Sequence, residues 1–122
     1  MTNVLFVCSA NRLRSPTAEQ VFSTWPGVET DSAGISSGAS VLLSSEQIDW
    51  ADIIFVMEKT HRNKLRSRFR SHLNNKRVIC LDIPDDYEFM DPVLVRMLEN
   101  RVGRFIAQAA PTTRDEPDEP AP

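Results

Sequence analysis

The sequence lacks most of the features that would place it in a specialised class of protein. It has only two cysteines in 122 residues, Cys8 and Cys80, too few for the disulfide framework of a small secreted domain. Its longest apolar run, residues 4–8, is far too short to cross a bilayer. The basic residues Arg12 and Arg14 follow this run, whereas those of a signal peptide precede it. We therefore expect a cytoplasmic protein with reduced thiols and no membrane partner.

The net charge is small, but the charged residues are unevenly placed along the chain. The net charge of -3 comes from residues 111–122, which hold four acids and one arginine, so the rest of the chain nets zero. Within that neutral part, residues 59–77 hold eight Lys or Arg and no acid, and residues 82–91 hold five acids and no base. The last segment is rich in acid and proline and nearly free of apolar side chains. We predict one domain over residues 1–110 and a disordered acidic, Pro-rich tail over residues 111–122.

Four apolar segments alternate with segments of helical character. The first and third of them run on without polar alternation, which is typical of strands buried on both faces of a parallel sheet. Strands that alternate with helices predict an α/β fold with right-handed crossovers. We expect a four-stranded parallel sheet with helices on both faces, a flavodoxin-like or Rossmann-like three-layer single domain. The predicted strands are residues 3–7, 28–32, 53–57 and 78–81.

Three of the four predicted helices begin with a recognisable signal. Ser15 precedes a proline, which predicts an N-cap followed by proline at the first helical position. Asp91 precedes another proline and predicts the same arrangement for the final helix. Ser44 and Gln47 have the spacing of a capping box.

The first predicted strand leads directly to Cys8, and five residues then separate this cysteine from Arg14. Ligands of parallel sheets bind at the carboxyl ends of the strands. A short loop before a helix can turn its backbone N–H groups toward one centre and bind a phosphate there. Arg14 would add a bidentate fork of donors, and the same surroundings favour a thiolate on Cys8. The intervening residues, all candidates for substrate binding, are Ser9, Ala10, Asn11, Arg12 and Leu13.

In a reaction through a phosphocysteine, the alkoxide or phenoxide leaves in the first step and the thiolate leaves in the second. Each leaving group needs a hydrogen-bond or proton donor. Ser15 directly follows Arg14, and we expect its hydroxyl to lie beside the sulfur and to assist the thiolate when a covalent intermediate breaks down. The acidic segment after the fourth strand emerges at the same edge of the sheet as Cys8. Asp85 and Asp86 are therefore both candidates for the general acid, and Tyr87 is placed to flank an aromatic substrate.

Together these segments resemble the low-molecular-weight protein tyrosine phosphatase family. The resemblance rests on the motifs "VLFVCSANRLRSPTAEQVF", "DSAG", "ADIIFVMEKTHRNKL" and "IPDDY", in chain order from about residue 4 to residue 105. It implies that Cys8 forms a phosphocysteine, that Asn11 shapes the loop and that Arg14 binds the phosphate. It also implies that Ser15 assists the thiolate and that Asp85 is the general acid. The implied substrate is a phosphotyrosine protein or a small aryl phosphate, with no metal and no other cofactor, and the implied state is a monomer or weak dimer.

Three departures from the family pattern concern specificity and regulation. Leu13 stands where members commonly carry a second cysteine. Asp86 replaces the proline after the acid, which leaves the choice between Asp85 and Asp86 open. The stretch over residues 34–50 is shorter than usual, so the family's substrate preference does not transfer.

Three alternative functions compete with this interpretation. An arsenate reductase of the same fold needs further cysteines, and the only other thiol, Cys80, is predicted to lie in the core. A nucleic-acid surface over residues 59–77 is disfavoured because the domain nets zero charge and lacks a base-stacking aromatic cluster. A non-catalytic phosphate-binding module is disfavoured because thiol, arginine and acid are all present. We therefore expect no nucleic-acid partner.

Overall fold

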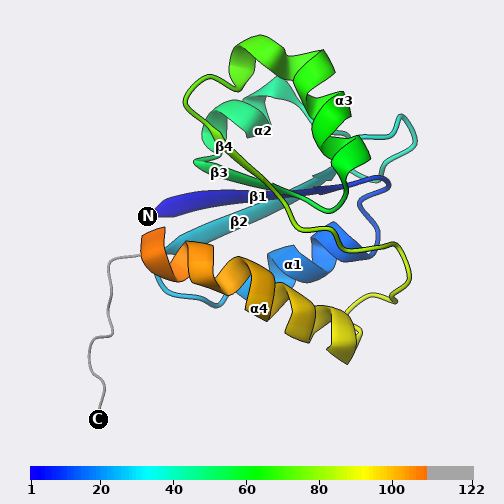
Figure 1. Cartoon of the computed structure of the whole chain (residues 1–122), viewed down its shortest axis with the longest axis vertical. Helices are drawn as coiled ribbons and strands as arrows, with labels where there is room; N and C mark the ends of the chain where they lie inside the picture. Colours follow the sequence, from blue (N-terminus) through cyan, green and yellow to red (C-terminus); the bar gives the residue numbers. More distant parts are fainter. Residues whose placement is uncertain (110–122) are drawn as a thin grey trace.

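The structure, a computed structural model, describes residues 1–109 and has a four-stranded sheet at its centre (Figure 1). The strands lie in the order β2-β1-β3-β4, and all three neighbouring pairs are parallel. This arrangement confirms the α/β fold with a parallel sheet that the sequence predicts. The strands are β1 (Thr2–Cys8), β2 (Val28–Gly34), β3 (Ile53–Val56) and β4 (Arg77–Cys80).

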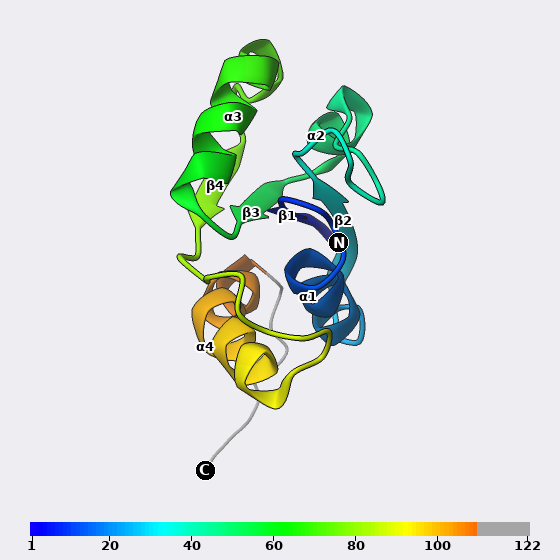
Figure 2. The ribbon, with the colours of Figure 1, turned by 90° about the vertical axis from the view of Figure 1, so that its right-hand side faces the viewer.

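Helices cover both faces of the sheet, as predicted. Figure 2 shows α1 and α4 on one side of the sheet and α2 and α3 on the other. The molecule therefore has three layers, and each helix layer shields one face of β1 and β3. The helices are α1 (Arg14–Phe22), α2 (Ser45–Trp50), α3 (Lys59–Phe69) with a 3-10 turn at Arg70–His72, and α4 (Pro92–Ala109).

The core is split by the sheet into two apolar clusters. On the side of α1 and α4, the ring of Phe6 stacks on Phe22 and Phe55, with ring centroids 5.7 and 5.5 Å apart. On the side of α2 and α3, Leu5 and Val7 of β1 belong to the second cluster. Residues 4–7 are fully buried, which explains why this strand has no polar alternation. Each such side chain contributes about 1.5–3 kcal/mol by leaving water.

The helix starts agree with two of the three capping predictions. Ser44 and Gln47 form the predicted capping box at α2, with N···O distances of 3.3 and 3.1 Å. The backbone N–H of Val93 donates to Asp91 Oδ1 at 2.8 Å, as expected of a capping carboxylate. The predicted N-cap at Ser15 is wrong, because α1 begins one residue earlier and no side chain caps it. The hydroxyl of Ser15 is instead bound to groups of the preceding loop.

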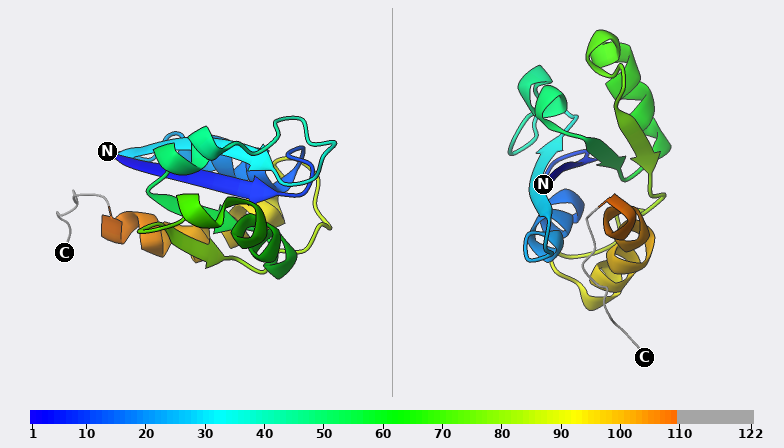
Figure 3. Two further views of the ribbon diagram at one scale, coloured as in Figure 1. Left: turned by 90° about the horizontal axis from the view of Figure 1, so that it is seen from above. Right: turned by 90° about the vertical axis from the view of Figure 1, so that its left-hand side faces the viewer.

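The loops that follow the strands gather at one edge of the sheet. Figure 3 shows the loops after β1, β2 and β4 at the end of the molecule toward which the strand arrows point. Every predicted site residue lies in or beside these loops. The predicted tail over residues 111–122 falls outside the described residues, and no helix among residues 1–109 is both long and apolar enough to cross a membrane.

Candidate active site

The end of β1 and the loop behind it enclose the sulfur of Cys8. This cysteine is buried, with 3% of its surface exposed. The backbone N–H of Asn11 donates to Cys8 Sγ at 3.3 Å, and Ser15 Oγ lies 3.0 Å from the same sulfur. Asn11 has a φ of 56°, a left-handed conformation that asparagine tolerates better than most residues. The tight turn thus brings two donors to the sulfur, which stabilises its anionic form.

A second loop, residues 35–43, supports the first from behind. The backbone N–H groups of Ile35, Ser36 and Ser40 donate to the carbonyls of residues 8, 9 and 10 at 2.9–3.0 Å. These carbonyls are therefore held by a neighbouring segment and do not repel an anion in the loop. Gly34 permits this close approach, because a Cβ there would lie 2.6 Å from the carbonyl oxygen of Ser9 and 2.5 Å from Ala39 Cβ.

A chain of hydrogen bonds fixes the direction in which Ser15 donates. The side-chain amide of Asn11 donates to Ser15 Oγ at 3.0 Å and to Ser32 Oγ at 2.9 Å. Ser32 in turn donates to Glu19 Oε1 at 2.5 Å. Because Ser15 Oγ accepts from the amide, its own hydrogen has two acceptors within reach, Cys8 Sγ at 3.0 Å and the carbonyl of Ala33 at 3.4 Å, and the sulfur is the nearer. The network therefore presents a donor to the sulfur, the role predicted for Ser15.

Arg14 is anchored through one of its terminal nitrogens. Its side chain is only 2% exposed, and Nη1 donates to Glu58 Oε2 at 2.5 Å and to the carbonyl of Ile83 at 2.8 Å. Nε lies 3.6 Å from Asp85 Oδ1. Nη1 thus holds the guanidinium in place, and the edge formed by Nε, which faces Asp85, and Nη2 is not used in this anchoring.

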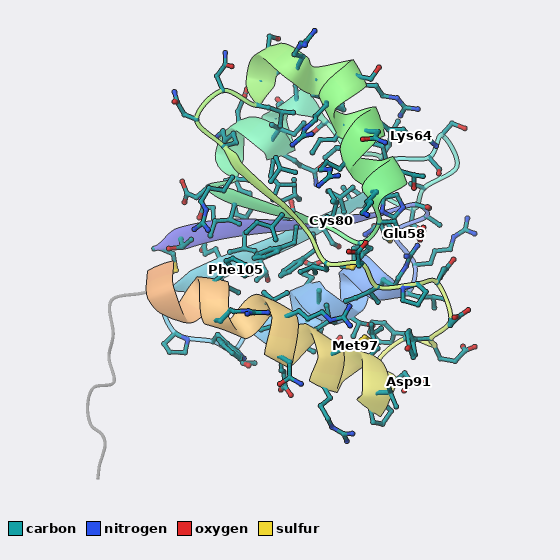
Figure 4. The ribbon with its side chains drawn as sticks, viewed as in Figure 1. Glu58, Lys64, Cys80, Asp91, Met97 and Phe105 are labelled. Atoms are coloured by element: carbon teal, nitrogen blue, oxygen red, sulfur yellow. The ribbon has the colours of Figure 1, made fainter. Side chains whose placement is uncertain are left out.

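The start of α3 connects the arginine to the loop. Glu58, labelled in Figure 4, is the N-cap residue of α3 and forms a capping box with His61. Its backbone N–H donates to His61 Nδ1 at 3.1 Å, and the backbone N–H of His61 donates to the carbonyl of Glu58 at 3.1 Å. His61 Nε2 lies 2.8 Å from Ser9 Oγ. Burial, and then the positive charge of Arg14, lower the pKa of His61 to about 4. His61 is therefore neutral at physiological pH, and because Nδ1 accepts, Nε2 carries the hydrogen and donates to Ser9.

Glu58 and His61 are functional candidates that the sequence-based prediction missed. Two signals were present: Glu58 closely follows the third strand, so it emerges at the same edge as Cys8, and His61 stands three residues later, at capping-box spacing.

The acidic loop brings one of its two candidate acids to the site. A cavity of about 210 Å³ lies over the loop, and Asp85 contributes to its wall. Asp86 is exposed and does not line this cavity, and Tyr87 is half-buried against the core cluster of α1 and α4. The residues that line the cavity are Cys8, Ala10, Arg12, Leu13, Arg14 and Asp85. The geometry therefore distinguishes Asp85 from Asp86, which the sequence alone did not.

The second cysteine is less buried than predicted. Cys80 ends the edge strand β4 and is half-buried, because no further strand covers that side of the sheet. Its Sγ lies 3.6 Å from Asp82 Oδ1, and neither Cys80 nor Cys8 forms a disulfide. Among residues 1–109, no group of three or more His, Cys, Asp or Glu side chains is arranged to hold a metal ion.

Comparison with known proteins relates this chain to phosphatases. No family model matches it. A curated protein-arginine-phosphatase of Geobacillus stearothermophilus is 33% identical over 90 residues, an alignment that covers 54% of this chain and 61% of that relative. The chain thus spans less than two thirds of the length of the curated relative it matches.

Two solved structures have the same fold. The YwlE arginine phosphatase of Geobacillus stearothermophilus superposes with a TM-score of 0.73 at 25% identity, over 89% of this chain and 93% of that one. The low molecular weight protein tyrosine phosphatase SP-PTP of Streptococcus pyogenes superposes with a TM-score of 0.70 at 18% identity, over 85% and 93% of the two chains.

Proposed function

We propose that the chain is a member of the low-molecular-weight protein tyrosine phosphatase family and hydrolyses phosphate monoesters through a phosphocysteine intermediate. The observation that carries this proposal is the pair of donors, the Asn11 amide and the Ser15 hydroxyl, that converge on Cys8 Sγ at the floor of the cavity. A buried structural cysteine has no need of two donors, whereas a nucleophilic thiolate does.

In the first step, the thiolate of Cys8 attacks the phosphorus in line with the leaving oxygen. An S–P bond forms, the ester P–O bond breaks, and Asp85 transfers its proton to the leaving alcohol or phenol. The fork of Arg14 and the backbone N–H groups of the loop bind the phosphoryl oxygens, where negative charge is spread in the transition state. The position of Asp85 on the cavity wall beside Arg14 supports its assignment as the acid.

In the second step, Asp85 takes a proton from a water molecule, and this water attacks the phosphorus from the side that the alcohol has left. The S–P bond breaks, inorganic phosphate forms, and the sulfur departs as a thiolate. The hydroxyl of Ser15, oriented by Asn11, stabilises that thiolate as it leaves.

The proposed substrate is an aryl phosphate, either phosphotyrosine in a protein or a small molecule. The relatives include both arginine and tyrosine phosphatases, so phosphoarginine is the second candidate. Arg12 favours the aryl ester, because its exposed cation lines the cavity and repels the guanidinium of phosphoarginine. Neither hydrolysis needs a metal or other cofactor, and we propose that the enzyme acts in the cytoplasm as a monomer or weak dimer.

The test is a panel of p-nitrophenyl phosphate and two matched peptides that carry either phosphotyrosine or phosphoarginine. We expect turnover of the first two substrates, slower turnover of phosphoarginine, and complete loss of turnover in folded Cys8→Ser. Asp85→Asn should slow a substrate with a poor leaving group far more than Asp86→Asn does. Retained hydrolysis in Cys8→Ser would refute the mechanism, and faster release of phosphate from phosphoarginine would reverse the substrate assignment.

A further inference from the structure

A large hollow on the described part of the molecule lies apart from the active site. It has a volume of about 770 Å³ and lies between α3, the 3-10 turn behind it and the edge strand β4. Three cations and no carboxylate contribute to its lining. We name it the α3–β4 groove, and its lining residues are Asn63, Arg66, Ser67, Arg70, Leu73, Lys76 and Val78.

The positive charge of this region has no carboxylate partner among residues 1–109. Residues 59–77 include eight Lys or Arg, and none of them takes part in an ion pair there. Lys76 Nζ donates to two backbone carbonyls and Arg68 to a third, which orients these side chains but does not neutralise them. Arg62, Arg66 and Arg70 follow one another at four-residue spacing, so they repel each other along the helix and its 3-10 extension. The charges of Arg66 and Arg70 in the groove are therefore available to an anionic partner.

The groove and the active site lie toward opposite ends of α3 and share no lining residue. The helix starts at Glu58, which holds Arg14, and a smaller hollow of about 340 Å³ lies at this start, lined in part by Glu58 and Asp82. Figure 4 labels Glu58 at this end of α3 and Lys64 farther along it. Arg66 is eight residues beyond Glu58, or about 12 Å along the helix axis. An extended peptide covers that distance with about four residues.

We propose that the α3–β4 groove binds an acidic segment of the phosphorylated protein whose phosphate is held at Cys8. This inference rests on the proposed function and names the class of substrate: phosphoproteins with carboxylates that begin about four residues from the phosphorylated side chain. Carboxylates nearer to the phosphate meet two acids, Glu58 and Asp82, and one cation, Lys59, so they gain less than carboxylates that reach the three cations of the groove. A nucleic acid fits the groove less well, because no aromatic side chain lines it for base stacking.

The experiment compares three phosphotyrosine peptides of equal length. One has four glutamates that begin at the fourth residue from the phosphotyrosine, one has glutamines there, and one has the four glutamates adjacent to the phosphotyrosine. We expect kcat/KM for the first peptide to be about tenfold higher than for the other two at low ionic strength. The difference should shrink in 0.5 M salt, where screening reduces the Debye length to about 4 Å.

Two double variants separate the groove from general charge effects. Arg66→Glu with Arg70→Glu reverses the groove, and Arg96→Glu with Arg104→Glu reverses the same charge on exposed positions of α4, on the other face of the sheet. We expect the first variant to lose the preference for the acidic peptide, the second to keep it, and both to hydrolyse p-nitrophenyl phosphate like the wild type. Equal rates for all three peptides, or equal effects of the two variants, would overturn the proposal.

Direct binding measurements keep this test independent of turnover. Titration of Cys8→Ser with the same peptides, lacking phosphate, should show weak binding of the acidic peptide only, lost on reversal of Arg66 and Arg70. If p-nitrophenyl phosphate is not hydrolysed, the proposed function fails while this titration still reports on the groove. Tighter binding of a 12-nucleotide RNA than of the acidic peptide, lost in the same variant, would reassign the groove to nucleic acid.

Discussion

Two helices begin at the active site, and their first turns are built in opposite ways. The start of α1 has Leu13 at the N-cap position and no side-chain cap, although Ser15 is close enough in sequence to have supplied one. The start of α3 is capped reciprocally by Glu58 and His61. The start of α1 thus has no side-chain cap for its backbone N–H groups, whereas the start of α3 has a capping box.

The difference shows that the start of one helix is suited to bind an anion, while the start of the other positions the residues that bind it. An uncapped N-terminus presents N–H groups and a positive dipole end to an anion, which suits the loop that ends at Arg14. The capped N-terminus of α3 provides side chains that position the loop before α1. Glu58 accepts a hydrogen bond from Arg14, and His61 is hydrogen-bonded to Ser9. Substitutions at the two helix starts should therefore have different consequences, and the predictions below follow in order of expected effect.

The largest loss is expected from Arg14→Lys, at the uncapped start. A lysine keeps the charge but has no planar fork, so the bidentate contact with phosphate oxygens disappears. We expect kcat to fall by about 10²–10³, the typical cost of one preorganised stabilising group. The steady-state rate with p-nitrophenyl phosphate measures this loss, and circular dichroism checks the fold. A loss below tenfold would mean that the loop N–H groups alone hold the phosphate.

Glu58→Gln, at the capped start, should have the next largest effect. The amide still accepts one hydrogen bond but no longer holds the guanidinium of Arg14 by charge, so the arginine is free to leave its fixed position. A misplacement of about 1 Å costs up to about 10²-fold in rate, and we expect kcat to fall by about tenfold to a hundredfold. Asp82→Asn is the matched control, because it removes an acid from the same small hollow without touching Arg14. If both variants lost activity equally, the loss would reflect local charge and not the position of Arg14.

The sequence predicts the fold well because its signals are local. The uninterrupted apolar run over residues 4–7 predicts a strand buried on both faces, and the structure places it in the middle of the sheet. The capping box of α2 follows from two residues three positions apart. Such patterns need no knowledge of what lies across the molecule.

The site is predicted only in part, because its supports come from distant segments. The Cys8 to Arg14 loop is contiguous and therefore visible in the sequence. The bond from Arg14 to Glu58 joins residues 44 positions apart, and the bond from His61 to Ser9 joins residues 52 positions apart. The error at Ser15 has the same origin: its hydroxyl is a plausible cap until the folded loop brings Cys8 and Asn11 to it.

Ser15→Ala and Ser44→Ala test the same substitution at an uncapped and a capped helix start. Ser15→Ala removes a donor to the departing thiolate, so we expect about a tenfold slower breakdown of the phosphocysteine, and it leaves one N–H of the buried Asn11 amide without its acceptor, so we also expect a loss of about 1 kcal/mol in stability. Ser44→Ala removes the cap of α2, so we expect about 1 kcal/mol lower unfolding free energy and unchanged turnover. Pre-steady-state release of p-nitrophenol and urea unfolding measure the two effects. A loss of stability in Ser15→Ala with unchanged breakdown of the phosphocysteine would mean that Ser15 has only a structural role.

The smallest effect expected at neutral pH is at the capped start of α3, where the change in stability develops only on acidification. His61 has its pKa lowered to about 4 in the folded protein, mainly by burial, against about 6.5 in the unfolded chain. Between these values the unfolded state binds more protons than the folded state, so the unfolding free energy decreases as the pH falls from about 6.5 to 4. His61→Gln removes this titration, and its unfolding free energy should therefore change less over that range than that of the wild type. Urea unfolding at half-unit pH intervals gives both slopes. Because carboxylates also titrate near pH 4, the difference between the two curves is the informative quantity, and parallel curves would show that His61 is not held neutral by its contacts at the start of α3.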